Sequence, residues 1–98
     1  MDLRIQSVNF DATEQLKAFV EKKTKKLEKI YDGIIQAEVT MKVVKPDSAQ
    51  NKDVSIKLNI RNGELFANKI ADTFEEATDH CVDALEKQII KSKEKKDR

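Results

Sequence analysis

Lysines are crowded into one short stretch of this sequence. Residues 22–29 read KKTKKLEK, with five lysines in eight positions. On a helix, like charges three or four residues apart repel each other by roughly 0.2–0.5 kcal/mol per pair. Such a cluster is either ordinary solvated surface or a set of contacts to an anionic partner, because each lysine can act as a point charge toward a phosphate.

A helical wheel separates these lysines into three kinds. Lys25 follows Glu21 by four residues, in the favourable order for an ion pair, and is interpreted as ordinary surface charge. Lys23 falls inside the apolar stripe, where a lysine must extend along the edge of the core to reach water or a phosphate. The remaining row has no acid three or four residues before it and consists of Lys22, Lys26 and Lys29.

A second basic row is predicted on the last helix. It contains His80, Lys87 and Lys91, and the opposite face carries Glu75, Asp79, Asp83 and Glu86. Acids early and bases late complement the helix dipole, but the dipole does not explain why they occupy different faces. If the two helices pack side by side, their rows can form one cationic surface that contacts phosphates. The candidate RNA-binding residues are Lys22, Lys23, Lys26, Lys29, Lys87 and Lys91.

The other reactive side chains form no catalytic or metal-binding pattern. His80 is the only histidine, and Cys81, the only cysteine, lies on an apolar stripe that predicts a buried, unreactive thiol. Adjacent residues on a helix do not face each other. No Cys/His set has zinc spacing, and no Gly-rich phosphate loop occurs. We therefore expect no enzyme, metal, cofactor or small-molecule substrate.

Composition indicates one cytoplasmic domain. The chain has 98 residues, of which 39% are hydrophobic, enough for a single two-layer core. No apolar run is long enough for a transmembrane helix, and the first ten residues lack the apolar block of a secretory signal. A single cysteine fits a reducing compartment. The net charge is only +1, yet residues 64–86 carry seven acids against one lysine, so charge is sorted along the chain.

Alternating apolar residues predict four strands, over about residues 2–8, 34–45, 54–61 and 64–71. In the second strand the inward positions are Ile35, Ala37, Val39, Met41 and Val43. In the third they are Val54, Ile56, Leu58 and Ile60. Between the last two strands, Asn62-Gly63 matches a two-residue type I′ turn.

Two helices complete the predicted fold. Asp11 with Glu14 forms an Asp version of the capping box before the first helix, and Asp32-Gly33 supplies a left-handed stop. Asp72 or Thr73 caps the second helix, whose buried stripe is Phe74, Cys81, Val82, Leu85 and Ile89. The order β-α-β-β-β-α predicts an α+β fold with a four-stranded sheet and both helices on one face, like a double-stranded-RNA-binding domain. Residues 1–93 are expected to form the domain, and 94–98 a flexible basic tail.

The stretches DATEQLKAFVEKKTKKLEKIYD and TFEEATDHCVDALEKQIIK, in this topology, resemble the ribosome hibernation promoting factor family. This family has also been called the sigma-54 modulation proteins and includes the ribosome-associated inhibitor. The resemblance covers about residues 1–93. Its most specific parts are KKxxKLEK in the first helix and LEKQIIK in the second.

The resemblance implies a ribosome-binding domain that silences translation. Members bind the small (30S) ribosomal subunit between head and body, contact 16S rRNA, overlap the mRNA and tRNA sites, and act in stationary phase or stress. The family's basic positions correspond to Lys23, Lys26, Lys29, Lys87 and Lys91, and the helical wheel adds Lys22. Relatives often have a basic residue at the position of Ala84, so this chain differs from them there. The length resembles the short hibernation-promoting type, for which ribosome pairing would need a separate dimerising factor.

Two other functions remain open from the sequence. A double-stranded RNA-binding module has an α-β-β-β-α core contained in this topology, but it places lysines at the start of its second helix, where this chain reads DTFEEATD. A protein-interaction domain without an RNA role would instead use the acidic face of the second helix.

Overall fold

The computed structural model describes residues 1–44, 49–61 and 63–96. The elements follow the predicted order β-α-β-β-β-α. Their bounds are β1 Asp2–Val8, α1 Glu14–Ile30, β2 Ile34–Val43, β3 Lys52–Ile60, β4 Gly63–Ala71 and α2 Phe74–Lys96.

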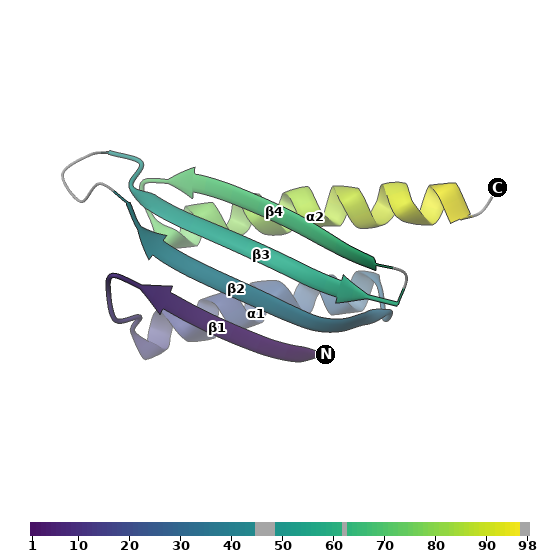
Figure 1. The fold of residues 1–98 in the computed structure, drawn as a ribbon, viewed down its shortest axis with the longest axis horizontal. Helices are drawn as coiled ribbons and strands as arrows, with labels where there is room; N and C mark the ends of the chain where they lie inside the picture. Colours follow the sequence, from purple (N-terminus) through teal and green to yellow (C-terminus); the bar gives the residue numbers. More distant parts are fainter. Residues whose placement is uncertain (45–48, 62, 97–98) are drawn as a thin grey trace.

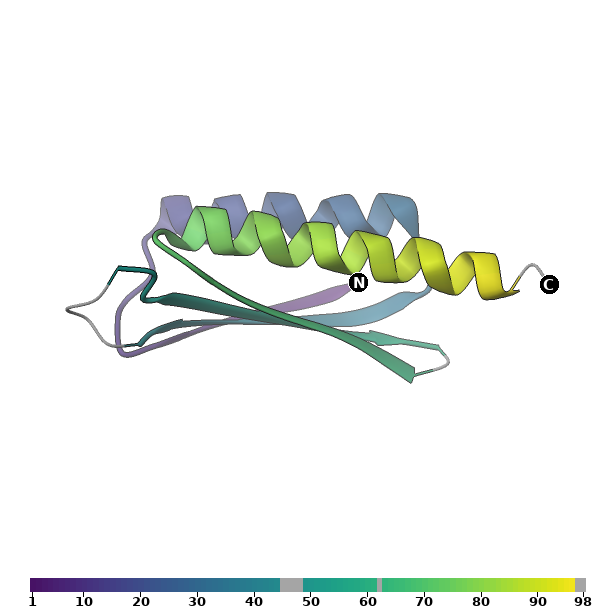
Figure 2. The same ribbon diagram turned by 90° about the horizontal axis from the view of Figure 1, so that it is seen from above.

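One four-stranded sheet forms the base of the molecule, in the order β1-β2-β3-β4. β1 pairs with β2 in parallel, because α1 carries the chain back across the sheet between them, and the other two pairings are antiparallel. Both helices lie on one face of the sheet and leave the other face open (Figures 1 and 2). This arrangement confirms the predicted α+β fold.

The core lies between the sheet and the helices. Successive side chains on a strand point to opposite faces, so only one face of each strand is buried. The predicted inward residues Ala37, Val39 and Met41 of β2 are buried, as are Val54, Ile56 and Leu58 of β3. All five residues of the stripe predicted for α2 are buried as well. The helix and strand periodicities therefore fixed most of the core correctly.

The start of β2 differs from the prediction because the strand contains a bulge. Ile34 pairs with Ile60 and Gln36 pairs with Asn59, so one extra residue is inserted in β2. Ile34 is consequently buried, and Ile35 is 58% exposed. The prediction that Ile35 faces the core is wrong, since the bulge changes the side on which it lies.

Both predicted ends of α1 are also wrong. Thr13, not Asp11, is the N-cap: its hydroxyl accepts a hydrogen bond from the backbone N–H of Leu16 at 3.1 Å. The helix ends at Ile30, and the next residue, Tyr31, is extended. Gly33 does not adopt the left-handed conformation predicted for a cap. Its role is spatial, because a Cβ atom there would lie 2.5 Å from the ring of Tyr31.

Thr73 is the residue that caps α2. Its hydroxyl accepts a hydrogen bond from the N–H of Glu76 at 3.1 Å. The neighbouring Asp72 has a different role: its carboxylate accepts a hydrogen bond from the N–H of Gln50 at 2.7 Å and so ties the connector after β2 to the end of β4. Of the two predicted caps, the structure selects Thr73.

Two further predictions concern the edges of the described residues. Gly63 opens β4 opposite Ile60 with a φ of 144°, but Asn62, the other half of the predicted type I′ turn, lies outside the described residues. The backbone of α2 is helical as far as Lys96. A domain boundary after residue 93 stays a prediction. Across the described ranges, no helix combines the length and the apolar character that a membrane crossing requires.

The buried hydroxyl of Thr78 on α2 leads to a testable prediction about stability. Thr78 is fully buried, and its hydroxyl makes no hydrogen bond within the described part of the chain, whereas the buried Thr24 hydroxyl donates to the Val20 carbonyl at 2.7 Å. We expect Thr78→Val to raise the free energy of unfolding by about 1 kcal/mol, because it removes an unsatisfied polar group without changing shape. Urea denaturation measures the change.

The matched control is Thr24→Val, which removes a satisfied hydroxyl of the same size. We expect it to be neutral or to lower the free energy of unfolding by about 1 kcal/mol. If both variants lost the same stability, the distinction between the two hydroxyls would be wrong.

Candidate nucleic-acid interface

The lysines of α1 separate as the helical wheel predicted. Lys25 pairs with Glu21 at 3.0 Å. The α1 row, defined as Lys22, Lys26 and Lys29, is exposed, and none of its members forms an ion pair with the described residues. Three neighbouring positive charges on one helix face therefore have no ion-pair partner among the described residues.

Lys23 bridges the two helices. Its side chain is 35% exposed, and its Nζ lies 3.2 Å from a carboxylate oxygen of Asp79 on α2 and 5.5 Å from the centre of the Phe19 ring. The side chain therefore runs along the edge of the core, as predicted. Its charge is directed at Asp79, however, so a phosphate that contacts Lys23 must compete with that carboxylate.

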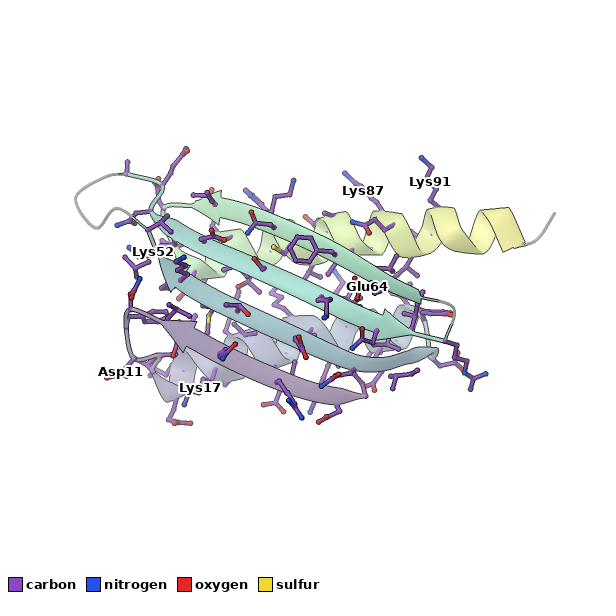
Figure 3. The ribbon with its side chains drawn as sticks, in the orientation of Figure 1. Asp11, Lys17, Lys52, Glu64, Lys87 and Lys91 are labelled. Carbon is purple, nitrogen blue, oxygen red and sulfur yellow. The ribbon has the colours of Figure 1, made fainter. Side chains whose placement is uncertain are left out.

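The basic row of α2 lies on the side of the helix away from α1. Lys87 and Lys91 are exposed and point away from α1 (Figure 3). Asp79, and by helical spacing Glu86 seven residues later, lie on the side nearest α1. The α1 row and the α2 row are consequently separated by acidic side chains. The two rows do not merge into the single cationic surface that side-by-side packing suggested.

The rotation of α2 explains this separation. Its buried stripe, which includes Cys81 and Leu85, must face the sheet. This requirement turns Asp79 toward α1 and turns Lys87 toward the free edge of β4. There, Gln88 donates a hydrogen bond to the Phe66 carbonyl at 3.0 Å. The candidate interface thus has two cationic margins, one on each helix.

The sequence does not predict the roles of two residues near these margins. It places Asp79 only on an acidic face, and it gives no indication that Lys69 of β4 shares a cleft with His80 and Lys87. Both contacts join elements that the chain separates, so residue spacing within one helix carries no signal of them.

On the open face of the sheet, part of the positive charge is paired. Lys57 lies 3.8 Å from a carboxylate oxygen of Glu38 and 3.9 Å from one of Glu64. The amide of Asn68 donates to the Val54 carbonyl and to the Ser55 hydroxyl. Arg4 and Lys42, which are exposed and alternate with core-facing residues of β1 and β2, form no ion pair with the described residues, so this face keeps isolated free cations but no lysine row like that of α1.

Cys81 is buried, as predicted, and is chemically quiet. Its thiol donates a hydrogen bond to the Val54 carbonyl at 3.2 Å. Burial raises the pKa of Cys81 to about 11, so the nucleophilic thiolate does not form near neutral pH. In the described ranges, no three His, Cys, Asp or Glu side chains are grouped to hold a metal ion.

A comparison with protein families decides the identity. The sequence model of the family described as "Sigma 54 modulation protein / S30EA ribosomal protein" matches residues 3–97 of this chain. The chain belongs to this family. The family resemblance seen in the sequence is therefore confirmed.

Relatives of this S30EA family member cover almost its whole length. The chain is 34% identical to the ribosome hibernation promoting factor of Escherichia coli K12 over 95 residues, which are 97% of this chain and 96% of that relative. It is 32% identical to the factor of the same name from Azotobacter vinelandii, over 97% of this chain and 85% of that relative.

Solved structures share the fold of this family member. A ribosomal subunit interface protein from Coxiella burnetii aligns with a TM-score of 0.85 at 20% identity, over 95% of this chain and 98% of that one. The N-terminal domain of Thermus thermophilus Protein Y aligns with a TM-score of 0.77 at 23% identity, over 91% and 96%.

The bridge between Lys23 and Asp79 can be tested by a double-mutant cycle. We expect Lys23→Met and Asp79→Asn to show a coupling free energy of about 0.2–1 kcal/mol, a small value because the two side chains are 35% and 46% exposed. The coupling should fall at high salt. A cycle on Lys25 and Glu21 gives the reference for a pair within one helix, and zero coupling at low salt would contradict the bridge.

The raised pKa of the Cys81 thiol predicts that the stability of the fold depends on pH. The unfolded chain loses the thiol proton near pH 9, but the folded chain keeps it to about pH 11. The free energy of unfolding should therefore fall as the pH rises through this window, by roughly 2–3 kcal/mol from this group. Denaturation of wild type and Cys81→Ala at pH 8 to 11 measures it, with pH values set by the two pKa values. Identical slopes in the two proteins would show that the thiol contributes nothing.

Proposed function

We propose that this protein is a ribosome hibernation factor. It binds the small (30S) ribosomal subunit at 16S rRNA in the channel for mRNA and tRNA, and it inhibits translation in the cytoplasm during stationary phase or stress. The observation that supports this proposal is that 97% of this chain aligns with relatives named ribosome hibernation promoting factor, and that the chain belongs to the S30EA family.

The distribution of charge supports binding through local rows of lysines. The net charge of +1 gives the whole molecule little attraction for RNA. The α1 row, in contrast, holds three exposed lysines that repel each other and lack acidic partners among the described residues. Phosphates placed against this row relieve the repulsion and release counterions, so binding should weaken as salt rises.

The position of the two margins supports a site with RNA on more than one side. Lys87 and Lys91 point away from α1, and acidic residues separate them from the α1 row. A single flat duplex surface would meet those acids between the two rows. A channel, which surrounds a bound domain, can instead present separate phosphates to each margin.

The start of α2 disfavours the alternative of a double-stranded RNA-binding module. Its first turn carries Glu75 and Glu76, both exposed, where such a module needs lysines. These carboxylates repel the phosphates of a duplex. Among the contacts of the described residues, none favours a protein-interaction role for the acidic face of α2, so that function is only an outcome of the experiment.

The experiment is co-sedimentation with purified small subunits over a salt series. We expect wild type to bind in a salt-sensitive way and the triple variant Lys22/Lys26/Lys29→Gln to bind at least tenfold more weakly, with a salt slope smaller by roughly 2–3 because each lost phosphate contact removes about 0.7–0.9. The same variant should lose inhibition of translation in a cell-free system.

The control is Lys17/Lys25/Lys42→Gln, which makes the same change in net charge. Lys17 and Lys25 are already paired with Glu14 and Glu21, and Lys42 lies on β2. It should bind almost like wild type. Equal binding of wild type to any long RNA duplex would favour the double-stranded RNA module, and no RNA binding at low salt by a folded protein would overturn the proposal.

A further inference from the structure

A cleft of about 450 Å³ lies between α2 and the edge strand β4. It is lined by Lys69 of β4 and by His80, Asp83, Ala84 and Lys87 of α2. This volume is within the range of sites for small organic groups, roughly 300–1,000 Å³. The cleft lies beside the α2 row but includes a residue from a different element.

The strand places Lys69 in the cleft. The helix-facing side chains of β4 are at alternate positions, and Ala67 and Ala71 on this side are buried. Lys69 lies between them in the alternation, so its side chain leaves the strand toward α2. It remains exposed because β4 is the last strand of the sheet. The partly buried methyl group of Ala84 opposite fills little of the space.

The lining carries an excess of uncompensated positive charge. Lys69, His80 and Lys87 are exposed, and no ion pair joins any of them to the described residues. Other lysines, such as Lys23 and Lys57, do pair with carboxylates. In the cleft itself, two ammonium groups face one carboxylate, that of Asp83, and His80 adds a ring N–H donor in either tautomer.

The shape of this basic region fits a polymer of phosphates. Lys91 lies one helical turn beyond Lys87, about 6 Å along α2, so the cations continue in a line from the cleft. An extended acidic peptide is a poorer occupant, because such a peptide would pair with the edge of β4. There, Gln88 already donates a hydrogen bond to the Phe66 carbonyl.

We propose that Lys69, His80 and Lys87 form a phosphate-binding cleft for the RNA backbone, so that the RNA-contacting surface extends from α2 onto β4. The inference rests on the proposed function and adds two residues, Lys69 and His80, to it. Asp83 opposes the phosphate and limits the affinity of the cleft.

The first test compares Lys69→Ala with Lys42→Ala in binding to small subunits over a salt series. Lys42 is an exposed lysine on β2, and its removal changes the net charge equally. We expect Lys69→Ala to weaken binding roughly three- to tenfold and to reduce the salt slope by about 1, as for one lost phosphate contact, and Lys42→Ala to change neither. Equal binding of the two variants to small subunits would overturn the proposal that Lys69 contacts a phosphate in the cleft.

A second substitution in the same cleft separates a charge effect from a folding defect. Ala84 lines the cleft beside Lys69, so Lys69→Ala combined with Ala84→Lys returns one ammonium group to it. This double variant should recover most of the lost affinity. Asp83→Asn alone should bind severalfold more tightly than wild type. Failure of both changes would overturn the proposal even if Lys69→Ala binds weakly.

The source of the phosphate is tested by NMR titration of the full chain with a single-stranded RNA oligonucleotide and, separately, with inorganic phosphate at equal ionic strength. We expect the amides of Lys69, His80 and Lys87 to shift with RNA only. Saturable shifts with inorganic phosphate alone would indicate a small-anion site and overturn the RNA assignment. If wild type binds the oligonucleotide through the cleft but not the small subunit, the proposed function fails and the cleft does not.

Discussion

Two helices must bury their apolar stripes against the same face of one sheet, and the positions of the charged side chains depend on this requirement (Figure 2). Residues such as Leu27 of α1 and Leu85 of α2 are fully buried, and their burial fixes the rotation of each helix. Ion pairs cannot reverse this rotation. A surface ion pair stabilises the fold by at most about 1 kcal/mol, whereas the burial of one large apolar side chain contributes roughly 1.5–3 kcal/mol. The electrostatic surface is therefore a consequence of the packing.

The packing separates the basic residues into groups that differ in their ion-pair partners and in the helix face on which they lie. Lys23 meets Asp79 at the contact between the helices, and Lys87 and Lys91 point away from α1. The α1 row forms no ion pair within the part of the chain that the structure describes. A nearly neutral protein can in this way carry strong local positive fields without a large net charge. In the proposed complex with RNA, the acids between the margins would disfavour a ligand whose phosphates meet these carboxylates.

Several local predictions are wrong at places where the same residues allow two interpretations. A bulge of one residue exposes Ile35, and nothing in the alternation of β2 marks it, since both Ile34 and Ile35 are apolar. Asp11 and Thr13 are both good N-caps, and the observed helix begins after the second. The sequence predicts a left-handed cap at Gly33, whereas in the structure a side chain is excluded there by the ring of Tyr31.

The sequence by itself determined the order of elements, the core side of most strands and helices, the buried state of Cys81 and the family. These features repeat with a period of two or 3.6 residues or extend over the whole chain, so one sequence contains enough copies of each signal. Only the tertiary structure decided which charges meet. Lys23 and Asp79 are far apart in the chain, as are Lys69 and Lys87, and each pair is brought together by packing that no spacing within one element encodes.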